Sequence, residues 1–148
     1  MTTPKELIEI AREAARNAYA PYSGFGVGAA VLLTDGSVVT GANFENASYG
    51  LSLCAETVAL AAVSAQGRLK DVVEIGVIGG MIGPGGSPTG AKAVGPCGRC
   101  RQVINEAAQV GGRDIPVHCG APEGDAIETY LLSELLPFAF GPKDLDKA

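Results

Sequence analysis

Three cysteines and one glutamate are the residues of this chain whose types and spacing could do chemistry. Cys54 is followed two residues later by Glu56, and Cys97 and Cys100 form a Cys-x-x-Cys pair that a proline introduces. Three thiolates and one exchangeable water suit a four-coordinate zinc with an open position, whereas a closed structural site uses a fourth protein ligand. A nearby glutamate then supplies the carboxylate that moves protons. The pattern therefore indicates a catalytic zinc site with Glu56 as its proton shuttle.

Other roles are open to cysteines of this kind. They occur as small buried apolar residues, as redox pairs, in structural zinc sites and in disulfides, and a Cys-x-x-Cys pair alone does not separate these roles. Glu56 favours the catalytic site, because a structural site has no use for a carboxylate beside its ligand. Residues 1–7 hold no apolar signal segment, which favours metal and thiol chemistry in a reducing cytoplasm over disulfides.

The length and charge of the chain limit the classes of substrate and partner that it can bind. A chain of 148 residues predicts a single domain, residues 1–148, which is large enough to bury a core without cross-links. The net charge is −5 and the basic residues form no cluster, whereas phosphate binding needs concentrated positive charge. Glycines and charges interrupt every apolar run before it reaches membrane-spanning length. We therefore expect a small, weakly charged substrate, no nucleic acid and no membrane.

Hydrophobic periodicity and turn residues predict the elements that position these side chains. Helical patterns cover residues 4–19, 53–65 and 98–109; strand patterns cover residues 25–33, 37–43, 71–79 and 115–119; residues 127–136 are short and end as a helix. Thr3 and Ser52 are the expected N-caps of the first two helices, and an Asp-Gly turn closes a hairpin between the first two strands. Residues 79–95, dominated by glycine and proline, predict a loop, and residues 137–148 a tail.

This order of elements predicts an α/β fold, with a mixed sheet sandwiched by helices. Both cysteine clusters open helices, and helix N-termini carry partial positive charge and free N–H groups that favour thiolates. Two such N-termini facing one another would bring the three sulfurs to one point.

Several motifs, in order, resemble the cytidine deaminases of the small, homotetrameric, three-cysteine type. They are APYS at residues 20–23, FGVGAA at 25–30, NFENASY at 43–49, CAE at 54–56, PCGRCRQV at 96–103 and LLPFAF at 135–140. The resemblance runs over residues 6–145. It implies the cytidine deaminase fold, a three-layer α-β-α sandwich around a mixed, mainly five-stranded sheet. It also implies hydrolytic deamination of cytidine and 2′-deoxycytidine to the uridines in pyrimidine salvage, with one zinc per subunit.

The resemblance also implies roles within one subunit. Cys54, Cys97 and Cys100 would bind zinc. Glu56 would take a proton from the attacking water and pass it to a ring nitrogen and then to the leaving amine. The backbone N–H of Ala55 would hold the pyrimidine carbonyl.

Further substrate contacts are implied around this centre. Asn43 and Glu45 would bind the ribose hydroxyl, and Phe25 would pack against the nucleoside. In a homotetramer, neighbouring subunits would add the remaining contacts, Ala47 and Tyr49 to the sugar and Phe140 to the base. By residue type alone, Asn43 and Glu45 are also ordinary turn residues, and the two phenylalanines are also core residues.

The chain departs from the family in two places. The residue after the CAE glutamate is Thr57, where the family most often has an arginine that hydrogen-bonds the zinc thiolates; Arg99 is then the expected substitute donor, or else an exposed helix residue. The loop at residues 79–95 is longer than usual and ends almost at the metal ligands, where it could reshape the pocket.

His118, the only histidine, and Cys119 lie on a predicted strand, and we interpret both as structural.

Three alternatives to the leading function stay open at this point. One is an aminohydrolase acting on a modified cytosine nucleoside, similar to blasticidin S deaminase. A second is a polynucleotide deaminase or zinc-dependent nucleic-acid binder, against which the lack of a basic stripe argues. The third is a non-enzymatic zinc scaffold, in which Glu56 would have no role.

Overall fold

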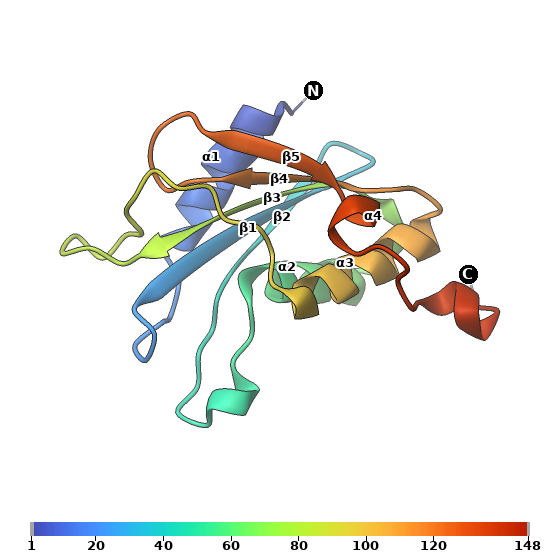
Figure 1. Cartoon of the computed structure of the whole chain (residues 1–148), viewed down its shortest axis with the longest axis horizontal. Helices are drawn as coiled ribbons and strands as arrows, with labels where there is room; N and C mark the ends of the chain where they lie inside the picture. Colours follow the sequence, from blue (N-terminus) through green and yellow to red (C-terminus); the bar gives the residue numbers. More distant parts are fainter. Residues whose placement is uncertain (1, 148) are drawn as a thin grey trace.

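A five-stranded mixed sheet, with helices on both faces, forms the frame of the molecule in the computed structural model (Figure 1). The structure describes residues 2–147; Met1 and Ala148, which end the expected domain and tail, lie outside the described residues. The strands are β1 (Phe25–Leu33), β2 (Val38–Ala42), β3 (Val72–Met81), β4 (Pro116–Gly120) and β5 (Ile127–Leu131), and the helices are α1 (Pro4–Ala15), α2 (Ala55–Ala65), α3 (Gly98–Gly111) and α4 (Leu132–Leu135). The predicted α-β-α sandwich is confirmed.

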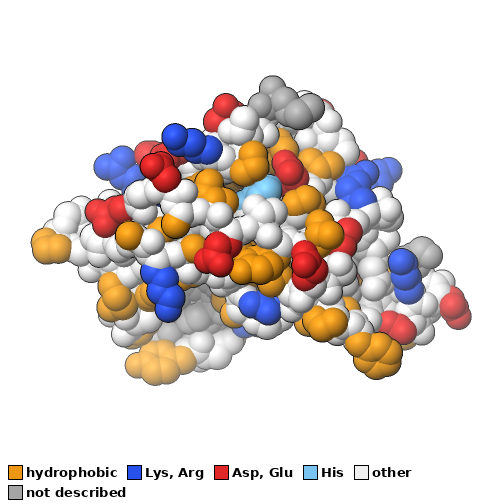
Figure 2. Space-filling model, turned by 45° about the horizontal axis from the view of Figure 1, so that its top comes forward, with side chains coloured by type: hydrophobic (Ala, Val, Ile, Leu, Met, Phe, Trp, Pro, Cys, Tyr) orange, Lys and Arg blue, Asp and Glu red, His pale blue; other side chains and the backbone are white. Residues whose placement is uncertain are grey.

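The sheet has the order β2-β1-β3-β4-β5, in which β3 and β4 are parallel and the other neighbours are antiparallel. One apolar cluster lies between the sheet and α2 and α3, and a second lies between the sheet and α1. Strand β1 alternates its side chains between the two clusters, which explains why it is an almost continuous apolar run. Within residues 2–147, every helix is too short or too polar to cross a membrane. On the face drawn in Figure 2, the Lys and Arg side chains lie apart from one another, scattered among Asp and Glu.

Glycines allow the helices that bear the site to lie directly on the sheet. A Cβ atom at Gly41 of β2 would lie 2.5 Å from the carbonyl oxygen of Ala55, the first residue of α2. On the opposite face, a Cβ at Gly28 would lie 2.0 Å from the Ala11 carbonyl oxygen of α1. Since no side chain fits at these positions, the N-terminus of α2 is held close to the strands.

Two helix boundaries differ from the prediction because loop backbone pairs with neighbouring elements. The first helix ends at Ala15, not at residue 19, since the N–H of Tyr19 donates to the Asn43 carbonyl instead of continuing the helix. Its predicted cap, Thr3, is confirmed. The second helix begins at Ala55, since Leu53 forms a β-bridge with Phe44.

The sequence predicted a loop over all of residues 79–95, but part of this segment is regular structure. Strand β3 continues to Met81, and Gly80 and Met81 pair with the first residues of β1. The chain then folds back on itself, with the Gly83 N–H donating to the Ser87 carbonyl and the Thr89 N–H to the Met81 carbonyl. The tail also contains structure, a short 3₁₀ helix at Pro142–Leu145. These pairings anchor the segment that leads to the second cysteine cluster.

Candidate active site and metal centre

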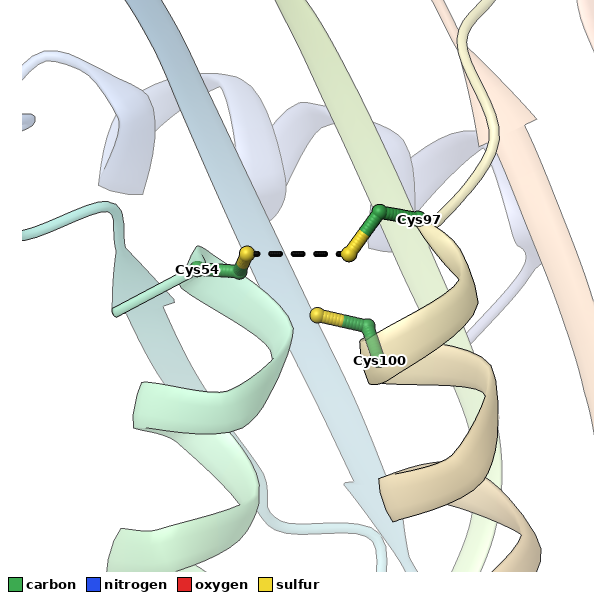
Figure 3. A group of neighbouring side chains, drawn as sticks. All are labelled: Cys54, Cys97 and Cys100. Atoms are coloured by element: carbon green, nitrogen blue, oxygen red, sulfur yellow. Dashed lines mark hydrogen bonds between the residues drawn. The ribbon is translucent and has the colours of Figure 1, made fainter. Parts of the chain in front are cut away.

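The three predicted ligand cysteines come together at the facing N-termini of α2 and α3 (Figure 3). Cys54 is the N-cap of α2, in place of the predicted Ser52, whose hydroxyl instead accepts a hydrogen bond from the Asn46 N–H. Cys97 is the N-cap of α3, and Cys100 lies in its first turn. Neither capping cysteine bonds its own helix, so both sulfurs are available to the gap between the helices.

The geometry of the sulfurs fits zinc. All three Sγ atoms lie within 4.8 Å of one another, and the Cys54 and Cys97 sulfurs are 3.7 Å apart. Zn–S bonds of about 2.3 Å in a tetrahedron require sulfurs about 3.8 Å apart. All of the cysteines among residues 2–147 are free thiols. The donor set is therefore three soft ligands with room for one more.

The electrostatics of the cluster favour a bound cation. Burial raises the pKa of the Cys54 and Cys100 thiols, and neighbouring thiols and Glu56 raise both further. Burial also opposes ionisation of Cys97, yet its net pKa is lowered, because nearby donor groups, the backbone of Cys100 and the thiols of Cys100 and Cys54, favour its thiolate. A divalent ion would relieve this crowding of acidic groups, because it holds the sulfurs as thiolates.

Glu56 is buried in the first turn of α2, with 3% of its surface exposed, and burial raises its pKa. It opens with Cys54 and Cys97 onto a cavity of about 430 Å³. The cavity is mostly apolar with a few polar groups, and its lining consists of Ser23, Phe25, Val27, Asn43, Glu45, Ser52, Leu53, Cys54, Glu56, Val94, Gly95 and Cys97. A carboxyl group and metal-type ligands in one concave pocket are the arrangement expected of an active site.

Asn43 and Glu45 both reach the cavity and also brace its rim. The Asn43 amide donates to the Phe25 carbonyl and accepts from the Val27 N–H, both at 2.8 Å, which fixes it on the edge of β1. Glu45 accepts hydrogen bonds from the backbone of Tyr22 and Ser23 and from the Ser23 hydroxyl. The Ser23 hydroxyl bond is the main cause of the lowered pKa of Glu45.

Phe25 and Ala55 also lie where the sequence placed them. Phe25 lines the cavity, and its ring packs over Gly79, where an added Cβ would come within 2.9 Å of it. Ala55 is the first residue of α2, so its N–H is among the helix amides without an intrahelical partner. Val94, from the long segment, packs beside Phe25 as a wall of the cavity that the sequence did not identify.

The three residues predicted to serve a neighbouring subunit lie outside this lining. Ala47 is exposed, Tyr49 is 73% exposed and Phe140 is 61% exposed. Tyr49 lines a smaller adjoining cavity with Glu45, while the Phe140 carbonyl accepts bonds from two α3 side chains, Gln102 and Asn105. This anchoring could not be predicted from local sequence patterns, because Gln102 and Asn105 are far from residue 140 along the chain.

The expectation that Arg99 is the substitute donor is wrong, and the alternative, an exposed helix residue, is confirmed. Among residues 2–147, the Arg99 side chain forms no hydrogen bond or ion pair, whereas the Thr57 hydroxyl lies 3.4 Å from the Cys100 sulfur. His118 lies on the α1 face of the sheet, bonded to Thr129 and Glu74, away from the sulfurs.

Comparison with known proteins agrees with this site. The family described as the cytidine and deoxycytidylate deaminase zinc-binding region matches residues 1–112, and this defines the class of the protein as a zinc-binding deaminase. The chain is 46% identical over 140 residues to a cytidine deaminase of Halalkalibacterium halodurans, covering 95% of this chain and 96% of the relative. It is 41% identical over 137 residues to one of Mycobacterium tuberculosis, covering 93% and 89%.

A solved structure is also similar to this chain. The crystal structure of a cytidine deaminase from Burkholderia pseudomallei superposes with a TM-score of 0.78 at 41% identity, covering 93% of this chain and 99% of that one. The chain belongs to the cytidine deaminase family of hydrolases, with a three-cysteine zinc site.

Proposed function

We propose that this chain hydrolyses cytidine and 2′-deoxycytidine to the corresponding uridines and ammonia, as a step of pyrimidine salvage. The observation that carries the proposal is the meeting of two ligand cysteines and the buried Glu56 in one cavity of about 430 Å³. That volume is in the range of pockets that enclose small ligands. Membership of the cytidine deaminase family supports the identity of the base.

Cys54, Cys97 and Cys100 would hold the zinc and leave one position for water. Zinc bound there is a Lewis acid that makes water a strong nucleophile near neutral pH. The ligands already converge without any rearrangement, because Cys54 and Cys97 are helix N-caps and Cys100 lies in the first turn of α3. Free thiol ligands suit a reducing compartment, and we place the reaction in the cytoplasm.

Glu56 would carry the protons of the reaction. It takes one proton from the attacking water and delivers it to the pyrimidine ring nitrogen. It then takes the remaining proton from the hydroxyl group added at C4 and passes it to the amine, which leaves as ammonia while the C4 carbonyl forms. Its burial beside Cys54 and Cys97 excludes bulk water from these transfers. The N–H of Ala55, at the positive end of α2, would hold the pyrimidine carbonyl and so orient the ring.

The sugar would lie toward the rim of the cavity. Glu45 and Asn43 each have acceptor capacity left beyond the bonds that fix them, so both can meet a ribose hydroxyl. Phe25 gives the nucleoside an apolar wall.

We also propose that the site is shared in a homotetramer. Ala47 and Tyr49 would contact the sugar of a neighbouring subunit's nucleoside, and Phe140 would stack on the base in another. Their exposure in the single chain, and the anchoring of the Phe140 backbone on α3, support this arrangement.

Ammonia release and the loss of nucleoside absorbance, measured with zinc-loaded protein, test the proposal. The panel contains cytidine, 2′-deoxycytidine and a cytosine nucleoside with a modified sugar. Turnover of the first two supports it. No turnover of either would overturn it, and a kcat/KM at least about tenfold higher for the modified nucleoside would favour the alternative aminohydrolase.

A further inference from the structure

The side chain of Thr57 connects the two helices that carry the metal ligands. Thr57 lies in the first turn of α2, and its Oγ1 is 3.4 Å from the Sγ of Cys100 on α3. Among residues 2–147, it is the one hydroxyl or cationic side chain in hydrogen-bond contact with a sulfur of the cluster.

Neither basic side chain next to the ligands takes this place. The Arg99 side chain is exposed and makes no hydrogen bond within the described residues. The Arg101 guanidinium donates to the carbonyls of Pro96 and Leu135, at 2.8 and 3.0 Å. Three thiolates carry more negative charge than one divalent ion neutralises. The sulfurs of such a centre therefore depend on hydrogen-bond donors, which stabilise the excess negative charge and fix the orientation of each sulfur.

The sulfurs have different neighbours. The Cys97 sulfur lies 3.7 Å from the sulfur of Cys54. The Cys100 sulfur faces the Thr57 hydroxyl across the gap between the helices. A metal-bound thiolate has no proton, so in the loaded protein the hydroxyl must be the donor.

We propose that Thr57 is a positioning residue that donates a hydrogen bond to the Cys100 thiolate, fixes that sulfur in the ligand position and thereby sets how tightly the chain retains zinc. The inference rests on the zinc-binding part of the proposed function and is independent of which nucleoside is deaminated. It assigns to a neutral hydroxyl a role that a cation would otherwise have.

Zinc transfer from the loaded protein to an excess of a chromophoric chelator tests the proposal without any nucleoside. Thr57→Val and Thr57→Ala remove the hydroxyl, and Thr57→Ser keeps it. Loss of a hydrogen bond to a metal ligand typically weakens metal affinity about 10- to 100-fold. We therefore expect faster zinc release of about that size from the Val and Ala variants, and release close to wild type from the Ser variant. Thr40→Val, at an exposed threonine of β2, is the matched control.

A cobalt(II)-loaded sample gives a second readout that helix packing alone would not move. Loss of the donor makes the Cys100 thiolate more electron-rich, so the sulfur-to-cobalt charge-transfer band of Thr57→Val and Thr57→Ala should shift to lower energy, and that of Thr57→Ser should stay in place. Wild-type release rates and an unmoved band in the Ala variant would overturn the proposal, as would a Ser variant that behaves like Ala. Cytidine turnover is measured separately, so a failure of the proposed function is distinguishable from a failure here.

Discussion

The first turns of α2 and α3 contrast with the segments around Tyr49 and Phe140, although all four belong to the expected site. The two helix N-termini place Glu56 and Cys100 in the interior, 3% and 0% exposed. Tyr49 and Phe140 lie on outer segments and are mostly exposed. One chain therefore builds the chemical half of the site by itself, whereas in our proposal the residues that enclose the nucleoside come from a second copy.

The contrast has a physical basis in how each region is supported. The N-terminus of α2 lies on β2 at Gly41, and a bridge between Phe44 and Leu53 fixes the chain that enters the helix. The backbone carbonyl of Phe140 accepts two hydrogen bonds from α3, while 61% of the residue is exposed, which leaves its ring accessible to another molecule. Ligand geometry needs rigid elements, whereas a stacking contact tolerates a looser segment.

The largest effect is expected at the chemical half. Glu56→Gln removes the proton shuttle without removing a metal ligand, so kcat should fall about 10²- to 10⁴-fold while zinc content stays at wild type. Ammonia release and metal analysis on the same sample check both parts. Glu106→Gln, at an exposed position of α3, is the control. A Glu56→Gln variant that keeps more than about a tenth of the wild-type rate would contradict the assigned role.

The support of α2 should be the next most sensitive feature. A methyl group at Gly41 would lie 2.5 Å from the Ala55 carbonyl oxygen and 2.7 Å from the Ala59 nitrogen. Such overpacking costs about 1–3 kcal/mol, so Gly41→Ala should lower the free energy of unfolding by that amount and reduce kcat, because the helix start moves. Urea unfolding measures it, with Gly85→Ala, whose Cβ would meet open space, as the control. Equal stability of the two variants would show that the close approach is not limiting.

Substitutions in the segments around Tyr49 and Phe140 should change mainly the affinity for substrate. If the Phe140 ring stacks on the base in another subunit, Phe140→Ala loses about 0.5–1.5 kcal/mol and KM rises about 2- to 13-fold, with kcat less affected. Leu145→Ala, another exposed apolar residue of the C-terminal segment, should leave KM unchanged. Steady-state kinetics with cytidine checks the pair, and an unchanged KM in Phe140→Ala would remove that residue from the site.

The smallest effect concerns the rim. Because the Ser23 hydroxyl lowers the pKa of Glu45 below its ordinary 4.5, this contact stabilises the fold fully above pH 4.5 and is lost as the pH falls through the lowered value. Thermal unfolding of Ser23→Ala should therefore show its largest deficit near neutral pH and converge with wild type in acid. A deficit that stays constant from neutral pH into acid would mean that the contact is not to the ionised carboxylate.

The sequence predicted those features that short segments determine by themselves. The cap at Thr3, the hairpin of β1 and β2 and the two helices that begin at the cysteines follow from local patterns. The bridge of Leu53 with Phe44 moved the cap from Ser52 to Cys54, since pairing between distant segments leaves no local signal.

The same limit applies within the site. Arg99 was expected beside the sulfurs because it lies between two ligands in the sequence, yet helix α3 turns it outward and brings Thr57 of α2 to Cys100 instead. Val94 became part of the cavity wall because the extended β3 and its anchored connection return the chain beside Phe25. These contacts depend on how helices and strands pack, which periodicity does not report.

A subunit-mixing experiment tests most directly whether one chain supplies the chemistry and another encloses the substrate. Glu56→Gln and Phe140→Ala chains with different affinity tags are co-expressed, purified through both tags and assayed with cytidine. In the hybrid, Phe140→Ala chains keep Glu56 and receive the Phe140 ring from their neighbours, so a population of sites with the wild-type KM should appear. A hybrid whose KM equals that of the Phe140→Ala protein alone would show that Phe140 does not serve a neighbouring subunit's site.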